Sequence, residues 1–412
     1  MKALKAFLLF WEKFFTVTSL LLFSKAVISV VRARPDAAEG DPFFQVIWLT
    51  IYVITFCLLA VQWRGFTRIP NNLNKPILVL TGIALFSYFW SNAPSVTLRR
   101  GIGLAGTTLF AIYFATRYSS KEQLRLLAWT LGTAAVLSLI FAVALPSYGL
   151  DVYPFAGAWR GVYIQKNILG RFMSINALIF LVIALSNKRY RWITWSIFGL
   201  SVALILLSTS KTSLIIFTTL LILLPFYRAL RWHYSLFVPI FIMAILVIAG
   251  FAIWFTTEAE TVLGYFGKDV TLSGRTDLWY NVVLMIQQRP WLGYGYSGFW
   301  LGAQGFSGYV WNVIGWPAPH AHNGFLDLWL DVGLIGVLAF VASFFTSLGQ
   351  AFTHLRNNKT WEAFWPLIFL TVFFLLNMTQ SVILDQNELM WIMYVALNFL
   401  RPIENSAPRL GK

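Results

Sequence analysis

The sequence predicts an all-α integral membrane protein with about twelve transmembrane helices and a large outer loop between the ninth and the tenth. Hydrophobic residues make up 58% of the 412 residues and charged residues only 11%, whereas a soluble domain contains about 25% charged residues. Apolar runs close to the 20 residues that cross a bilayer recur along the chain. This composition excludes a soluble enzyme, a DNA-binding protein, a secreted disulfide scaffold and a disordered chain.

Twelve apolar runs are candidate spans. The first is interrupted by Lys25, and no clean cleavage site follows it, so we interpret it as a span rather than a secretory signal. The third, fourth and twelfth runs are short or polar, which makes the count approximate. The expected spans lie near 14–31, 43–63, 76–92, 101–116, 124–145, 168–186, 192–208, 213–230, 235–256, 323–348, 363–381 and 387–400.

The distribution of basic residues predicts the orientation. The net charge is +15, and basic residues accumulate in cytoplasmic loops. If the N-terminus is cytoplasmic, every inner loop of this map carries at least two Lys or Arg residues, so we predict that both termini face the cytoplasm. The single cysteine, Cys57, permits neither an intramolecular disulfide nor a cysteine-based metal cage.

The span map divides the chain into three parts. Residues 1–256 carry the first nine spans, residues 257–322 form the outer loop, and residues 323–412 carry the last three spans and a cytoplasmic tail. The outer loop is rich in Gly, Trp and Tyr, and so many aromatic residues argue against disorder. We therefore expect a folded cap on the outer, periplasmic side.

A short amphipathic helix is expected inside this cap, at 276–287. Trp279, Val282, Val283 and Ile286 recur there at helical spacing and form one apolar stripe. The stripe is too short to span a membrane, so the helix should lie along the interface or under the cap. Turns should follow it at the residues that favour them, which are Pro290, Gly293, Gly295 and Gly298.

The segment PHAHNGFLDLWLDVGLIG (319–336) places polar residues at the mouth of the tenth span. Asn323, Asp327 and Asp331 follow one another at i, i+4 and i+8, so they share a helix face that must meet protein or a wet cavity. His320 and His322 could bind a metal, but no third ligand stands at a recognisable spacing. Proton transfer suits such histidines better, and a hydrogen-bonded structural role stays open.

Basic residues at outer-facing positions are candidate anion ligands. Arg275, at the start of the cap helix, could bind an anion together with backbone N–H groups, or it could pair with Asp277. Lys211 lies among hydroxyl groups and could instead snorkel. Arg100 and Lys166 could each neutralise an anion or bind lipid headgroups. Weaker candidates near Lys166 are Arg160, Gln165, Asn167 and Arg171.

Together these features favour one kind of ligand. An outer-facing basic cluster, a histidine and a roofed cavity suit a molecule with a diphosphate at the membrane surface, such as a lipid-diphosphate sugar.

The polar segments also resemble those of a known family, the O-antigen ligase and polysaccharide polymerase superfamily. HAHNGFLDLWLDVGLIGVLAF (320–340) is similar to its signature, in which a His-Asn pair opens a helix with an acidic residue before Gly-Leu-x-Gly. WSNAPSVTLRR (90–100) resembles the exopolysaccharide polymerase branch. Three further segments match in order, and they are IQKNILGR (164–171), STSKT (208–212) and SGRTDLW followed by RPWLGYGYSGF (273–279 and 289–299).

The resemblance implies a membrane glycosyltransferase that needs neither a metal nor another cofactor. Such an enzyme moves a glycan from undecaprenyl diphosphate to an acceptor hydroxyl, with inversion, on the periplasmic face of the bacterial inner membrane. His322 would be the catalytic base, with His320 as a second candidate. Arg275 and Lys211 would bind the diphosphate, and Arg100 and Lys166 are further candidates for this role.

Two acceptors and a different class of function stay open. A polymerase would use another lipid-linked repeat unit as acceptor, and a ligase would use lipid A core; the resemblance of 90–100 favours the polymerase. A transporter or flippase for lipid-linked saccharides is the alternative, but the sequence lacks a matched pair of broken helices in two halves. The expected partners are the donor, the acceptor, membrane lipids and other polysaccharide-assembly proteins, and no nucleic acid.

Overall fold

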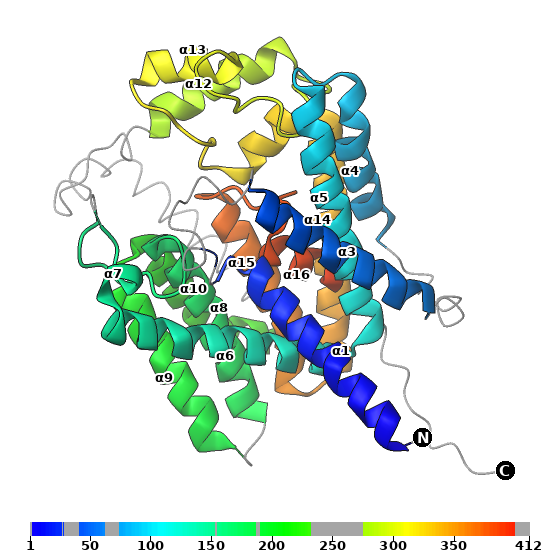
Figure 1. Cartoon of the computed structure of the whole chain (residues 1–412), viewed down its shortest axis with the longest axis vertical. Helices are drawn as coiled ribbons and strands as arrows, with labels where there is room; N and C mark the ends of the chain where they lie inside the picture. Colours follow the sequence, from blue (N-terminus) through cyan, green and yellow to red (C-terminus); the bar gives the residue numbers. More distant parts are fainter. Residues whose placement is uncertain are drawn as a thin grey trace.

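The computed structural model describes residues 2–26, 28, 41–61, 74–152, 155–186, 190–231 and 275–399. All regular elements in these ranges are helices, apart from an isolated bridge between Leu150 and Trp159. The helices, shown in Figure 1, are α1 (Lys2–Phe23), α3 (Pro42–Val61), α4 (Lys75–Phe86), η3 (Ser87–Phe89), α5 (Pro94–Arg117), α6 (Ser120–Ala144), α7 (Pro146–Gly149), α8 (Lys166–Ser186), α9 (Arg191–Leu207), α10 (Lys211–Ala229), α12 (Arg275–Gln288), α13 (Phe306–Ile314), α14 (Gly324–Asn357), η4 (Trp361–Phe364), α15 (Trp365–Asn377) and α16 (Leu389–Leu397).

The expected spans can be compared with these helices one by one. The ninth, 235–256, lies outside the described residues, and each of the others overlaps a helix. Within the described ranges, six helices are long and apolar enough to cross a membrane, and they are α1, α3, α6, α8, α10 and α14. The chain is therefore a multi-pass membrane protein, and the count of twelve stays a prediction.

The spans differ in how much of their surface meets the rest of the protein. In the most apolar window of α8, 83% of the residues are buried, against 33% in that of α3. Large apolar side chains such as Phe10, Val46 and Phe56 are exposed on α1 and α3. A soluble protein rarely exposes this much apolar surface, so these peripheral helices face lipid while α8 lies inside the bundle.

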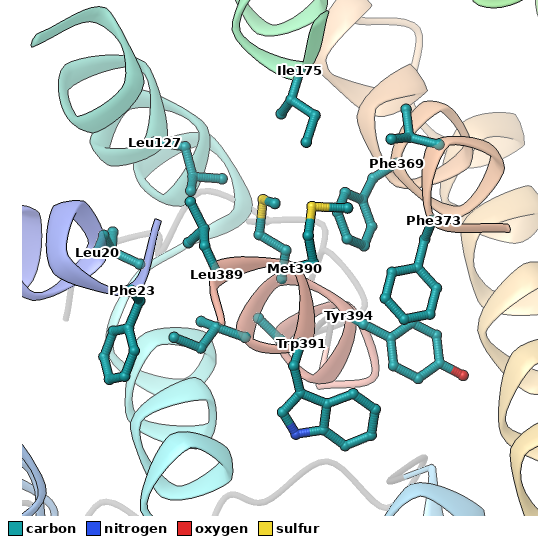
Figure 2. Packing of buried hydrophobic residues seen from close by; sticks show 14 of the residues in the cluster. Leu20, Phe23, Leu127, Ile175, Phe369, Phe373, Leu389, Met390, Trp391 and Tyr394 are labelled. Atoms are coloured by element: carbon teal, nitrogen blue, oxygen red, sulfur yellow. The ribbon is translucent and has the colours of Figure 1, made fainter. Parts of the chain in front are cut away.

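The last helix, α16, differs from its prediction as a membrane span at 387–400. It has nine residues, all of them buried, and its length of about 13 Å is less than half of a bilayer core. Figure 2 shows it surrounded by neighbouring helices, with Tyr394 beside Phe373. The rings of these two residues stack with their centroids 4.6 Å apart, and the indole N–H of Trp391 donates to the hydroxyl of Thr108 over 3.1 Å. Within the described residues this helix is too short to span a bilayer by itself, and an apolar run can be buried in protein as well as in lipid.

Helix α14 is broken at Gly333, whose φ and ψ of 68° and −172° are not helical. The turn that follows α12 enters this break. The N–H of Leu334 donates to the carbonyl of Pro290 over 2.8 Å, and the N–H of Tyr294 donates to the carbonyl of Leu330 over 2.7 Å. The turn therefore supplies hydrogen-bond partners that the interrupted helix lacks.

Residues of α12, α13 and the loops around them form a second hydrophobic core, separate from that of the bundle. Figure 1 shows α12 and α13 together at one end of the molecule. The segment 276–287 is helical within α12, but its buried face is rotated from the expected stripe: Leu278 and Met285 are buried, whereas Val283 is 39% exposed. The cause is the docking of α12 on α13 and α14.

We predict that Gly333→Ala strongly destabilises the protein. Backbone at this φ and ψ costs a non-glycine residue about 1–3 kcal/mol, and an added Cβ would lie only 2.1 Å from the carbonyl oxygen of Trp291. The melting temperature in detergent should fall. Gly349→Ala is the matched control, because this glycine lies in the same helix with nothing within 4 Å of its Cβ position, and Ala favours helices. Equal melting temperatures in the two variants would contradict the prediction.

Candidate active site

A polar cavity of about 670 Å³ lies where α5, α8, α12 and α14 meet the segment between α15 and α16. The packing of the helices brings together regions that are far apart in the sequence, and side chains from these regions line the cavity. The predicted site residues among them are His320, His322, Arg275, Arg100, Asp327 and Asp331.

The two histidines occupy a tight turn before α14. His322 has a φ of 52°, and its backbone N–H donates to Nδ1 of His320 over 3.0 Å. Their ring centroids are 4.2 Å apart, and the ring of Trp316 lies 5.9 Å from that of His322. Because Nδ1 of His320 accepts a hydrogen bond, a neutral His320 carries its proton on Nε2.

Asp327 holds this turn in place from the first part of α14. Its carboxylate accepts the N–H of Ala321 over 3.0 and 3.1 Å, the indole N–H of Trp300 over 2.7 Å, and the hydroxyl of Ser381. From the other side, the indole N–H of Trp279 donates to the carbonyl of Ala321 over 2.9 Å. The turn that carries the histidines is therefore fixed by α12 and α14 together.

The predicted polar face of α14 divides into two roles. Asn323 does not line the cavity: it is the N-cap of the helix, and its side chain accepts the N–H groups of Phe325 and Leu326, because an N-cap side chain folds back over the first turn. Asp331 does line the cavity, where the backbone N–H of Ser297 donates to it and Arg100 lies close enough to attract it.

Arg275 is the first residue of α12 and is partly buried against the cavity. Burial lowers the pKa of its guanidinium. Among the described residues no carboxylate lies within ion-pair distance of it, so the pair with Asp277 that the sequence allowed is not formed there. A cation without a counter-ion inside a polar cavity favours an anionic ligand.

Both histidines are held in the neutral form. Burial, with the charges of Arg275 and Lys25 adding to it, lowers the pKa of His320 to about 4. Burial again, with the neighbouring His320 and Arg275, lowers the pKa of His322 to about 3. A neutral imidazole can accept a proton, and an anion bound beside Arg275 would raise both pKa values. Among the described residues, no three His, Cys, Asp or Glu side chains gather as metal ligands.

Two predicted diphosphate ligands lie outside the cavity wall. Lys211 is the first residue of α10, and its side chain is exposed. Ser210 and Ser213 are buried against Gly170, so the side chain of Lys211 points to a different side of the helix. Its neighbour Thr212 lines the cavity instead. Lys166 donates to the hydroxyl of Thr209 over 3.0 Å, and its ammonium lies 4.1 Å from the ring centre of Phe155.

The sequence did not reveal an ion-pair network in the wall of the cavity as a site. Lys25 pairs with Asp385 at 3.2 Å and with the fully buried Glu388 at 2.9 Å. Arg171 pairs with the same Glu388 at 3.2 Å and donates to Gln380 at 3.2 Å. The available signal was charge within apolar runs, at Lys25 and at Glu388, since Arg171 appeared only as a weaker candidate.

Backbone strain is concentrated around the cavity. Six non-glycine residues in the described ranges have positive φ, and four of them line the cavity: Lys25, Ser297, His322 and Leu384. Such conformations persist only where surrounding contacts enforce them, and they are frequent at functional sites.

A multi-pass helical fold with a histidine, a partly buried arginine and carboxylates around one polar cavity defines a membrane protein with a candidate catalytic centre. A sequence model of the O-antigen ligase family matches residues 175–341. The exopolysaccharide production protein ExoQ of Rhizobium meliloti (strain 1021) is 27% identical over 344 residues, which cover 79% of this chain and 77% of ExoQ. The chain is therefore similar to the O-antigen ligase family along residues 175–341 and to ExoQ along most of its length, a likeness at the level of membrane glycan-transfer enzymes.

The depressed pKa values predict a pH dependence of stability. Since the unfolded histidine has a pKa of about 6.5 and the folded His320 of about 4, acidification between these values protonates the unfolded chain first and lowers stability. In His320→Asn, Oδ1 can replace Nδ1 as acceptor without titrating. The melting temperature of the unmodified protein should therefore fall more between pH 7 and pH 4.5 than that of the variant. Parallel curves would show that His320 is not held neutral.

Proposed function

We propose that the protein transfers a glycan from undecaprenyl diphosphate to an acceptor hydroxyl at the periplasmic face of the inner membrane. The proposal is carried by two groups on the wall of one polar cavity: the neutral His322, and Arg275, which has no carboxylate partner among the described residues. One group can remove a proton and the other can hold an anion. The basic inner loops of the span map support an orientation in which α12 and α13 face the periplasm.

The reaction needs little more than these two groups. His322 accepts the proton of the acceptor hydroxyl as its oxygen attacks the anomeric carbon of the donor glycan. The bond between that carbon and the diphosphate oxygen breaks, and the undecaprenyl diphosphate leaves with the electron pair. Attack opposite the leaving group inverts the anomeric centre. Arg275 stabilises the negative charge that develops on the diphosphate as the bond breaks. In this proposal the guanidinium provides this stabilisation without a metal ion.

His320 and His322 take different roles in this proposal. His320 is occupied at Nδ1 by the backbone of its neighbour, so it positions the turn that presents His322. Asp327 supports the same turn through Ala321. We therefore assign proton transfer to His322 alone, and the donor anion also raises its pKa towards the range of an effective base.

The effect of each residue should appear in different kinetic constants. His322→Ala should reduce kcat by about 10²–10⁴-fold, the usual contribution of a general base, in a purified assay with an undecaprenyl-diphosphate oligosaccharide and no added metal. Arg275→Ala should mainly raise KM for the donor. Lys211→Ala should change KM less, because its side chain is outside the cavity. Unimpaired turnover by His322→Ala would remove the proposed base, and unchanged donor KM in Arg275→Ala would remove the diphosphate role.

We further propose that the acceptor is another lipid-linked repeat unit, so that the protein is an exopolysaccharide polymerase. The support is its likeness to a protein named for exopolysaccharide production. Deletion of the gene should then remove high-mass polymer while single lipid-linked repeat units accumulate. Loss of lipopolysaccharide side chains with an intact pool of polymer would instead identify lipid A core as the acceptor and the protein as a ligase.

A further inference from the structure

A second cavity, of about 620 Å³, adjoins the first and has a different character. It lies between α3 and α5, and apolar side chains such as Trp48, Leu98 and Ile102 line it. Three residues line both cavities, and they are Lys25, Ile168 and Gln386. A polar chamber and an apolar chamber therefore meet at one place.

The apolar cavity is open towards the lipid-facing surface of the bundle. Leu49, Leu98 and Ile102 on its walls are 58%, 52% and 55% exposed. Deeper in, the cavity is closed by Trp48, which stacks on Phe23 at 5.1 Å, and by Tyr52, which donates to the carbonyl of Gly103. A hydrocarbon chain could enter this cavity from the bilayer, because it would move from one apolar environment to another without contacting water.

Lys25 is the cation that the two cavities share. Its side chain is 27% exposed, its backbone has a φ of 61°, and its ammonium contacts Asp385 and Glu388. The two carboxylates are not equally dependent on it, because Glu388 is also paired with Arg171. Asp385 is itself 27% exposed, so water can solvate it if Lys25 moves.

We propose that Lys25 is a donor-binding residue that exchanges Asp385 for the diphosphate of the lipid-linked glycan. The inference rests on the proposed function and adds a position for the ligand. In an isoprenoid-diphosphate glycan the charge lies between the hydrocarbon and the sugars, as Lys25 lies between the apolar and the polar cavity. The hydrocarbon occupies the groove between α3 and α5, and the glycan extends towards His322 and Arg275.

Donor kinetics test the exchange. Lys25→Ala should raise KM for the donor by about tenfold or more, because a charge-assisted hydrogen bond is lost, and Lys25→Arg should restore most of the affinity. Asp385→Asn should lower KM, because it removes the competitor for the ammonium. In the Lys25→Ala background Asp385→Asn should have no such effect. Lys121→Ala, which removes an exposed lysine paired only at 3.9 Å with Glu362, controls for the loss of one positive charge.

The apolar groove is tested with donors that differ only in chain length. Leu49→Trp should raise KM for the long-chain donor by about fivefold or more, because overfilling a cavity is unfavourable. It should leave KM for a short-chain analogue with the same diphosphate and glycan unchanged. Val53→Trp is the matched control: Val53 lies one turn further along α3 and is 53% exposed, but it does not line the cavity.

The outcomes separate this inference from the proposed function. If the unmodified protein transfers glycan but Lys25→Ala and Asp385→Asn leave donor KM unchanged, the exchange is refuted and the proposed function stands. If Lys25→Ala does not fold, Asp385→Asn alone provides the test. The exchange is then refuted if Asp385→Asn leaves KM for the donor unchanged or raises it. If the unmodified protein transfers nothing from a polyprenyl-diphosphate glycan, the proposed function fails first.

Discussion

The break in α14 at Gly333 is the constraint on which the rest of the site depends. A helix interrupted inside a membrane bundle must find partners for the peptide groups that it frees, since water is not available there. The turn after α12 provides them through Pro290 and Tyr294. Glycine is required because the φ of 68° is combined with a close approach of the turn to the backbone. These contacts thus fix the position of the turn after α12 relative to α14.

The loop that continues from this turn is held on its other side by the segment between α4 and α5. The backbone of Tyr296 makes two hydrogen bonds to this region: its N–H donates to the hydroxyl of Ser87 in η3 over 2.8 Å, and its carbonyl accepts the hydroxyl of Thr97 in the first turn of α5 over 2.8 Å. Its own phenol donates to the carbonyl of Leu384 over 2.6 Å. One short loop therefore joins α14, the start of α5 and the segment before α16, which together form the cavity. Trp300, a few residues on, then reaches Asp327.

The sequence predicts the outline of this arrangement and misses its interior for a physical reason. Apolar runs locate helices well, because a spanning helix and its length are both dictated by the bilayer. They cannot distinguish α16, buried in protein, from a helix in lipid, since both environments favour the same residues. The polar motif at 319–336 contains His322 and Asp327, whose side chains line the cavity, and their roles there stay a prediction. It could not reveal that Asn323 is a cap, because this depends on where the helix begins.

The pairing of Lys25 with Glu388 was beyond prediction for a related reason. Each lies in an apolar run about 360 residues from the other, and only tertiary packing makes them partners. Their pairing also explains why the cavity is not uniformly positive. A cation buried without ligand is unfavourable unless a carboxylate compensates it, so Lys25 and Arg171 share Glu388. Arg275 is different, because among the described residues nothing compensates it. The cavity therefore contains two kinds of cation. Lys25 and Arg171 are compensated without a ligand, whereas Arg275 is stabilised most when an anion binds. Burial also keeps the neighbouring His322 neutral.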